Sequence, residues 1–371
     1  PVDRKILWAR PLESRAGAQN VFGRNQNPLQ PMQQAAGLAN RHAAIQGATA
    51  AGALSLANEE FVGFQGRRTA TLLDALSGEV CWDYKGVRPG TIMLGGEETV
   101  FLRSPEKNHA VALRAGDGKK LDVKNLGETL DRAVHVVHDH FVMSGVGKSK
   151  SGLRLFDPIQ GRDLWTIDLA KGTLMSLLEN DRMALLEPET DGKSSKFAIV
   201  DLETGERQTL GTLGADELKG RTEAYALSDS INVYLLINKG ANQNYYSEQV
   251  PFVRASGLVM AFDPVAKRQR WKQTVQVQNL MLERLAFSPF LVFSSRKYEQ
   301  KGKVHFWSLH LLAIDKLSGA KLLDEKSAAQ PGFRSVTVSA VDRFVELRSY
   351  NERVRLYPVE KSAAAGQSGG D

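Results

Sequence analysis

A short phrase recurs along the chain of 371 residues, and it limits the fold more than any other feature of the sequence. Each of the five full copies has two apolar residues and an aspartate, with a glycine four positions after the aspartate, a tryptophan eight positions after it, or both. The copies keep Asp74, Gly78 and Trp82; Asp157, Gly161 and Trp165; Asp201 and Gly205; Asp263 and Trp271; and Asp315 and Gly319. Weaker copies begin at Arg114 and near Tyr357, and successive copies lie 40 to 62 residues apart. A period of this length is typical of folds built from one repeated supersecondary unit.

The phrase has a direct interpretation as a strand, a tight turn and a second strand. The apolar residues before the aspartate form a short run bounded by turn residues, as in a buried strand. An aspartate carboxylate can accept hydrogen bonds from backbone amides across a tight turn, and the glycine can adopt a positive φ there. The tryptophan of the second strand is large enough to fill the seam between neighbouring sheets.

Another hairpin precedes each phrase, for example in residues 55–64, 133–143 and 175–186. Each unit therefore has four strands, and units of this period stacked in a ring form a β-propeller. We expect an all-β fold, a single propeller of four-stranded antiparallel blades over residues 1–361, with seven blades. Residues 362–371 are rich in glycine and serine, and we expect them to form a disordered tail.

The two ends of the chain complement each other. Trp8 lies in a segment that looks like the end of a repeat whose beginning is absent, and the copy at Tyr357 is a beginning whose end is absent. We expect the N-terminal strand to pair into the last blade and close the ring, which leaves no long unpaired strand edge. Because the chain begins at Pro1 without a methionine, we expect a processed product or one part of a larger protein.

These residues resemble the quinoprotein-type propeller repeat, also called the PQQ-like repeat, whose pattern is Ala-x-Asp-x-x-Thr-Gly-x-x-x-Trp. The segments from Asp201 to Gly205 and from Asp157 to Trp165 match it best, and the resemblance extends over nearly the whole chain. It implies a propeller, often of eight blades, in either a quinone-dependent dehydrogenase or a non-enzymatic scaffold that works outside the cytoplasm. The alcohol-oxidising members carry two adjacent cysteines beside the cofactor, and the single Cys81 cannot supply that pair. The resemblance therefore implies the scaffold branch, an extracytoplasmic and most simply periplasmic location, and no cofactor.

Three segments exceed the repeat length, at about residues 10–51, 238–256 and 296–310. In a scaffold, function tends to lie in such insertions. Counting strands places all three on one sector of one face, since the second and third join strands two and three of their blades and the first joins two blades. The candidate interaction residues in the last two segments are Tyr245, Tyr246, Phe252, Arg254, Arg296, Lys297, Tyr298, Lys301, Lys303, Phe306 and Trp307.

Two interpretations of these insertions remain open. Tyr, Trp, Phe and Arg are enriched where protein interfaces gain most of their binding energy, which favours a contact surface for a protein partner. Alternatively, the hairpins extend their strands and pack their own aromatic side chains.

Other motifs have simpler explanations than a reaction centre. His135, His138 and His140 could suggest a zinc site, but they fall at the first hairpin turn of a unit, where other units also have polar residues. Residues 145–149 resemble part of a phosphate loop but lack its first glycine and lead into a strand. We therefore expect neither a metal site nor catalytic residues.

The composition excludes two broad classes of protein. A net charge of +6 is mild for this length, which argues against a dedicated nucleic-acid binder, and no apolar run is long enough for a transmembrane helix. The leading hypothesis is a monomeric, non-catalytic scaffold that binds protein. The alternatives are an enzyme that uses the central channel, such as a quinone-dependent oxidoreductase, and a lectin-like binder of anionic polysaccharide.

Overall fold

The computed structural model describes residues 53–66, 68–145, 151–239, 252–282, 285–301, 304–328, 335–339, 344–348 and 353–357. The chain divides into two compact units. The first comprises Pro1–Gly192 with Ala198–Gln208, and the second comprises Lys193–Phe197 with Thr209–Asp371. The expected N-terminal closing strand, the insertion at residues 10–51 and the tail at 362–371 all lie outside the described residues.

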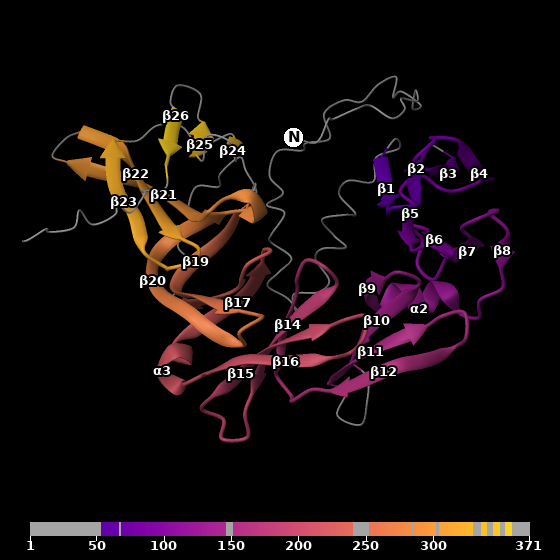
Figure 1. The fold of residues 1–371 in the computed structure, drawn as a ribbon, viewed down its shortest axis with the longest axis horizontal. Coiled ribbons are helices and arrows are strands. Elements are labelled where there is room, and N and C mark those ends of the chain that lie inside the picture. Colours follow the sequence, from indigo (N-terminus) through magenta and orange to yellow (C-terminus); the bar gives the residue numbers. More distant parts are fainter. Residues whose placement is uncertain are drawn as a thin grey trace, which may run out of the picture. The chain divides into compact units, whose positions relative to one another are not determined.

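The chain from Ala53 to Leu213 forms antiparallel sheets whose four strands follow the chain order, and the last of these sheets is divided between the two units (Figure 1). We call each such set of four successive strands a blade and number the blades along the chain. Blade one contains β1 (Ala53–Ala57), β2 (Phe61–Gln65), β3 (Thr69–Asp74) and β4 (Val80–Lys85). Blade two contains β5 (Ile92–Gly95), β6 (Thr99–Arg103), β7 (Ala110–Arg114) and β8 (Lys120–Leu121). Blade three contains β9 (Ala133–Val137), β10 (His140–Ser144), β11 (Gly152–Asp157) and β12 (Arg162–Asp168). Blade four contains β13 (Leu174–Leu177), β14 (Arg182–Pro188), β15 (Ser195–Asp201) and β16 (Arg207–Leu213).

Blades five and six depart from this pattern because they share a strand. Their strands form one seven-stranded sheet in the order β17 to β23. These are β17 (Arg221–Ser228), β18 (Val233–Lys239), β19 (Phe252–Asp263), β20 (Arg268–Met281), β21 (Phe290–Lys301), β22 (Val304–Asp315) and β23 (Lys321–Ala328). The long β20 pairs with β19 along its length, and Asn279 and Leu280 near its end also pair with β21. It is therefore the outer strand of blade five and the inner strand of blade six.

The remaining described strands form a sheet of three, β24 (Ser335–Ser339), β25 (Phe344–Arg348) and β26 (Arg353–Leu356). The described helices are short: α2 (Leu126–Arg132), α3 (Ala215–Leu218) and the 3-10 helix η2 (Leu285–Phe287). None of them is long and apolar enough to cross a membrane. The described residues thus confirm an all-β fold of successive four-stranded antiparallel sheets.

The aspartate of each full phrase organises its turn as the sequence predicts. In all five phrases, one carboxylate oxygen accepts hydrogen bonds of 2.6–3.1 Å from the backbone amides two and three positions later. The residue four positions later has a positive φ in every phrase. It is Gly78, Gly161, Gly205 and Gly319 in four of them and Lys267, with φ 54°, in the fifth. These turns set the antiparallel register of the third and fourth strands of a blade.

The tryptophans join neighbouring blades at this turn. Trp82, Trp165 and Trp271 each lie against the turn glycine of the following blade, which is Gly118, Gly205 or Gly319. Each indole N–H also donates to a backbone carbonyl of that turn, at 2.6 Å to Ala115, 3.3 Å to Glu203 and 3.0 Å to Lys316. The prediction that the tryptophans fill the seams between sheets is confirmed for these three, and Trp8 lies outside the described residues.

The apolar core lies in the same seams. One cluster joins Leu72 of blade one to Met93 and Leu102 of blade two, and another joins Trp271 of blade five to Phe293 of blade six. Cys81 lies on β4 as a free, partly buried thiol beside the first cluster. Burial raises the pKa of this thiol.

Alanine substitution at two turn glycines should separate backbone strain from tryptophan packing. Gly161 and Gly319 have φ values of 68° and 72°, so alanine is strained at both. A Cβ on Gly319 would lie 2.5 Å from Trp271 Cγ, whereas a Cβ on Gly161 meets nothing within 4 Å among the described residues. We expect Gly161→Ala to lower the free energy of unfolding by about 1–2 kcal/mol and Gly319→Ala by about 2–5 kcal/mol in denaturant titrations. Equal losses of unfolding free energy would show that the structure around Trp271 accommodates the added methyl group without extra cost.

Candidate functional site

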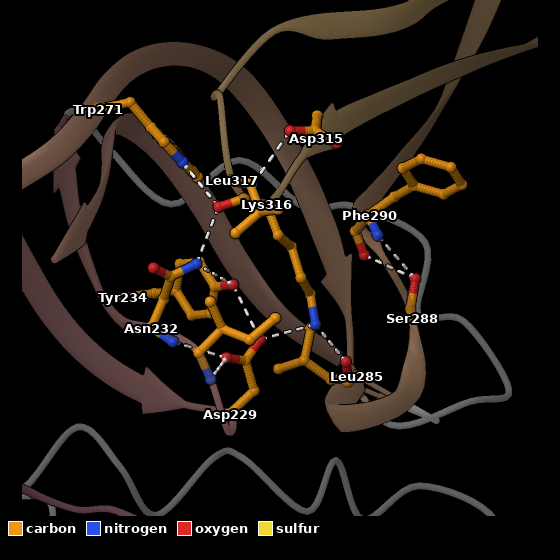
Figure 2. Close-up of polar contacts among 11 residues, drawn as sticks. Asp229, Asn232, Tyr234, Trp271, Leu285, Ser288, Phe290, Asp315, Lys316 and Leu317 are labelled. Atoms are coloured by element: carbon orange, nitrogen blue, oxygen red, sulfur yellow. Dashed lines mark hydrogen bonds and ion pairs between the residues drawn. The ribbon is translucent and has the colours of Figure 1, made fainter. Parts of the chain in front are cut away.

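A buried ion pair joins chain connections at one end of blades five and six, and we call this pair with its hydrogen-bond partners the lock. The Asp229 carboxylate lies in the turn between β17 and β18, and the Lys316 ammonium comes from the turn between β22 and β23 at 2.7 Å. The same ammonium donates to the backbone carbonyl of Leu285 in the connection between β20 and β21. Figure 2 shows the lysine side chain extended between these two oxygens. Three connections from two blades therefore meet at one point.

The lock is completed by neutral groups around the ion pair. Asn232 and Trp271 both donate to the backbone carbonyl of Lys316, and Tyr234 donates its hydroxyl to Asp229 (Figure 2). Asp229 also accepts from the backbone amides of Ile231 and Asn232. The buried carboxylate has donors on every side, as a buried charge requires.

The electrostatics and burial of this cluster indicate that it stabilises the fold and is not a reaction centre. Burial alone would raise the pKa of Asp229, but the hydrogen bond and charge of Lys316 bring that pKa below its ordinary value. Burial, followed by the charge of Asp229, raises the pKa of Tyr234. Asp229 and Lys316 are 4% and 2% exposed, so substrate cannot reach either group.

The lock determines the end of the blades at which residues 240–251 and residues 302–303 follow their strands. β18 begins just after Asp229 and β21 begins just after Leu285, so both strands start at the locked end and run away from it. The connection from β18 to β19, residues 240–251, and the turn from β21 to β22, residues 302–303, therefore leave from the opposite end. We call this the insertion end. The second and third segments thus join the second and third strands of their blades, and the first, residues 10–51, lies outside the described residues.

Asn238 links the two strands that flank residues 240–251. This side chain, 3% exposed on β18, donates to the carbonyl of Arg254 and accepts from the amide of Ser256, both on β19. The Ser256 hydroxyl donates to the carbonyl of Lys239. The last pair of the β18–β19 ladder is Asn238 with Gly257, and these side-chain contacts continue the link beyond it, beside the point where β19 shifts register against β20. Polar contacts thus join the ends of the two strands that flank residues 240–251.

Gly257 is required at this bend. Its φ is 134°, and a Cβ would lie 2.5 Å from the carbonyl oxygen of Ile237. Before the bend, Phe252 and Arg254 pair with Met281 and Asn279 of β20. The end of the predicted insertion at 238–256 is therefore strand, and it extends β19 alongside the shared strand β20.

A half-buried polar cluster lies beside this closure. The Tyr225 hydroxyl donates to Glu223 at 2.9 Å, and the Asn238 amide contacts the same carboxylate at 3.4 Å. Burial and then the charge of Glu223 raise the pKa of Tyr225, and the nearby positive charge of Arg254 opposes them. An acid, a phenol, an amide and a guanidinium thus lie together beside the strand ends that flank residues 240–251.

The other candidate residues fall in three groups. Tyr245, Tyr246 and Lys303 lie outside the described residues. Arg296, Lys297, Tyr298 and Lys301 lie on β21, and Phe306 and Trp307 lie on β22. The two strands pair from Phe290 with Asp315 to Lys301 with Val304, and Tyr298 faces Trp307 across the hairpin. The segment at 296–310 is therefore strand, and most of the positions predicted as an insertion extend the blade.

The segment with His135, His138 and His140 forms a hairpin of blade three that contacts the two neighbouring blades. His138 has φ 48° in the turn between β9 and β10, as expected for a polar turn. The next residue, Asp139, accepts from the backbone amides of Gly96 and Thr99 in blade two. His135 contacts the Asp181 carboxylate of blade four at 2.7 Å. Within the described ranges, no three His, Cys, Asp or Glu side chains gather as a metal site.

Sequence reasoning missed Lys316, Asn232 and Asn238. A signal for Lys316 was present, because the residue after the phrase aspartate is alanine, proline or leucine in the other full phrases and lysine only here. A charge at a position that is otherwise apolar indicates a local partner. The role of Asn238 depends on a bend in β19 that no sequence pattern announces.

Comparison with known proteins adds little to this description. No family model matches the chain, and no curated protein matches it. Among solved structures, BamB from Moraxella catarrhalis has 11% identity and a TM-score of 0.30, with 81% of this chain and 80% of that chain covered. A eukaryotic initiation factor has 11% identity and a TM-score of 0.35, with 78% and 79% covered. Hydrazine synthase from Kuenenia stuttgartiensis has 10% identity and a TM-score of 0.30, with 81% and 92% covered. These values are too low to support an argument about function, and the resemblance to the quinoprotein-type repeat stays a prediction from the residues.

Breaking the lock on one side should destabilise the second unit strongly. Lys316→Met leaves the Asp229 carboxylate buried without its cation, which costs about 3–5 kcal/mol of unfolding free energy. The exposed pair of Lys321 and Asp324 supplies a matched control, and Lys321→Met should cost less than about 1 kcal/mol. We expect the double variant Asp229→Asn with Lys316→Met to recover much of the loss in denaturant titrations. Equal effects of the two lysine variants would contradict a lock.

The lock should also be sensitive to acid. The pKa of Asp229 is lowered in the folded chain, so its contribution is present above the unfolded value of about 3.9 and is lost as the pH falls through the lowered pKa. Denaturant titrations at several pH values should therefore show wild type losing more stability below about pH 4 than the double variant. Parallel curves would argue against a charged pair.

Proposed function

We propose that this chain is a non-catalytic β-propeller scaffold that binds a protein partner at the insertion end of blades five and six. The observation that supports this proposal is the direction of β18 and β21. Both strands start at the lock formed by Asp229 and Lys316, so the 240–251 connection and the 302–303 turn follow them at the same end. A single partner can therefore contact both connections.

The chemistry of the insertion end suits a protein partner. The 240–251 connection carries Tyr245 and Tyr246, and the hairpin beyond Ser295 carries Tyr298, Phe306 and Trp307. Aromatic and arginine side chains contribute most to protein interfaces because they bury large areas at small entropic cost. Basic residues of the same hairpin, among them Arg296, Lys297 and Lys301, favour a partner surface with acidic groups.

The proposal includes the closed ring that the sequence predicts. Seven blades result if the N-terminal strand around Trp8 completes the sheet of β24, β25 and β26, which lacks a fourth strand among the described residues. Closure by an N-terminal strand would remove the last exposed edge. The repeat pattern, by its resemblance to the quinoprotein-type family, favours a place of action outside the cytoplasm.

Replacing the two connections should abolish capture of the partner. The first bait is the intact chain. The second replaces residues 240–251 with a Gly-Ser linker, and the third shortens the hairpin by replacing residues 299–306 with Asn-Gly. A matched control replaces residues 146–150, which join the second and third strands of blade three, with Gly-Ser. Quantitative mass spectrometry after pull-down from native extract identifies the retained proteins.

We expect one protein to be retained by the intact chain and the control, and to fall at least ten-fold with both shortened baits. The purified partner should then bind the intact chain in calorimetry with the same order of loss. Each bait must first melt cooperatively, which separates loss of the surface from loss of the fold. Equal retention by all four baits would overturn the proposal.

A further inference from the structure

The tryptophan contacts do not join every pair of neighbouring blades. Blades one, three and five carry Trp82, Trp165 and Trp271, while the equivalent positions of blades two and four hold Asp122 and Thr209. A tryptophan accordingly covers the turn of blades two, four and six. The turns of blades three and five receive no tryptophan from the preceding blade.

The turn of blade three keeps the geometry of a covered turn. Gly161 has φ 68°, as Gly118 does, and its amide donates to the Asp157 carbonyl as in the other turns. A Cβ added to Gly118 or Gly205 would lie 2.7 Å from a tryptophan ring. A Cβ on Gly161 meets nothing within 4 Å among the described residues, and the exposed Asp122 has no ring to place there.

Two apolar side chains near Gly161 are exposed. Ile159 of the same turn is 49% exposed, and Leu164, at the bulge of β12 against β11, is 41% exposed. We call Gly161, Ile159, Leu164 and the carbonyl of Pro158 the Gly161 site. The Pro158 carbonyl is equivalent to those of Ala115 and Lys316, which accept from Trp82 and Trp271.

Blade five offers no comparable site, because its turn has Lys267 where the others have glycine. At the glycine turns that hold a ring, a Cβ would lie 2.5–2.7 Å from it, so the Cβ of Lys267 leaves no room for an indole ring in that arrangement. The uncovered glycine is therefore a specific feature of blade three, and blade five serves as an internal control.

We propose that the Gly161 site binds a tryptophan side chain of a partner polypeptide. The chain itself shows which group fits, since three turns of the same geometry each hold an indole ring against glycine with its N–H bonded to a turn carbonyl. The proposal goes beyond the scaffold function, because this site lies at a turn between third and fourth strands, whereas the insertion end is formed by connections between second and third strands.

The chain's own sequence supplies the probe. A fluorescein-labelled peptide with the sequence of residues 268–275, which carries Trp271, is titrated with the intact chain and followed by fluorescence anisotropy. A second peptide replaces its tryptophan with alanine and keeps the same charge. Three protein variants are compared, namely Gly161→Ala, Asp122→Trp and the matched control Thr209→Trp.

We expect the tryptophan peptide to bind the intact chain at least ten-fold more tightly than the alanine peptide. Gly161→Ala puts a Cβ into the site, and Asp122→Trp lets blade two fill the site itself, so each should weaken binding at least ten-fold. Asp122→Trp should also raise the melting temperature by about 2–4 °C. Thr209→Trp faces Lys267 and should change neither quantity.

The proposal is overturned if the intact chain does not distinguish the two peptides. It is also overturned if Gly161→Ala and Asp122→Trp, both melting cooperatively, bind the tryptophan peptide as the intact chain does. A rise in melting temperature for Asp122→Trp without peptide binding to the intact chain would show that the site accepts only a tryptophan of its own chain, which contradicts a partner site.

Discussion

The contact between a tryptophan and the turn glycine of the next blade is the interaction on which the rest of this fold depends. A four-stranded antiparallel sheet has two apolar faces to cover and cannot do so alone. The indole ring covers part of one face and its N–H is satisfied by the neighbouring turn, so one residue supplies both apolar burial and a directional bond. The glycine makes the contact possible in two ways, because it permits the positive φ and leaves room for the ring.

Blades five and six are joined by more than the tryptophan contact. The shared strand β20 and the buried pair of Asp229 and Lys316 supplement the contact of Trp271 with Gly319. The pair is costly to desolvate and gains little stability over an apolar contact. Its value lies in geometry, since a buried charge with one set of partners holds three connections in a single arrangement and thereby fixes the insertion end.

The sequence was sufficient for the repeating parts of the fold and insufficient for their exceptions. The aspartate turns, the positive φ of their glycines and the tryptophan seams follow from the aspartate, glycine and tryptophan that recur at fixed spacing in the phrase. The shared strand β20 was not predicted, because the phrase marks each turn but does not show whether the strand after it ends within its own blade. Asn238 acts at a bend in β19, and the register shift of β19 against the next strand, β20, is not marked by any feature of the phrase. Of the candidate interaction residues, Tyr245, Tyr246 and Lys303 lie outside the described residues, and the others lie on β19, β21 and β22.

A repeat protein is informative where its copies differ, because an identical copy can be explained by folding alone. Asp122 is polar where the phrase has tryptophan, and Lys316 is charged where the phrase has a small or apolar residue. The second of these has a buried partner and is explained by the lock. The first leaves a glycine turn with intact geometry and no ring against it among the described residues, at a cost in stability to the seam of blades two and three. A chain that keeps three such contacts and omits a fourth at a conforming turn leaves a glycine and a turn carbonyl in the arrangement that holds an indole ring elsewhere in the fold.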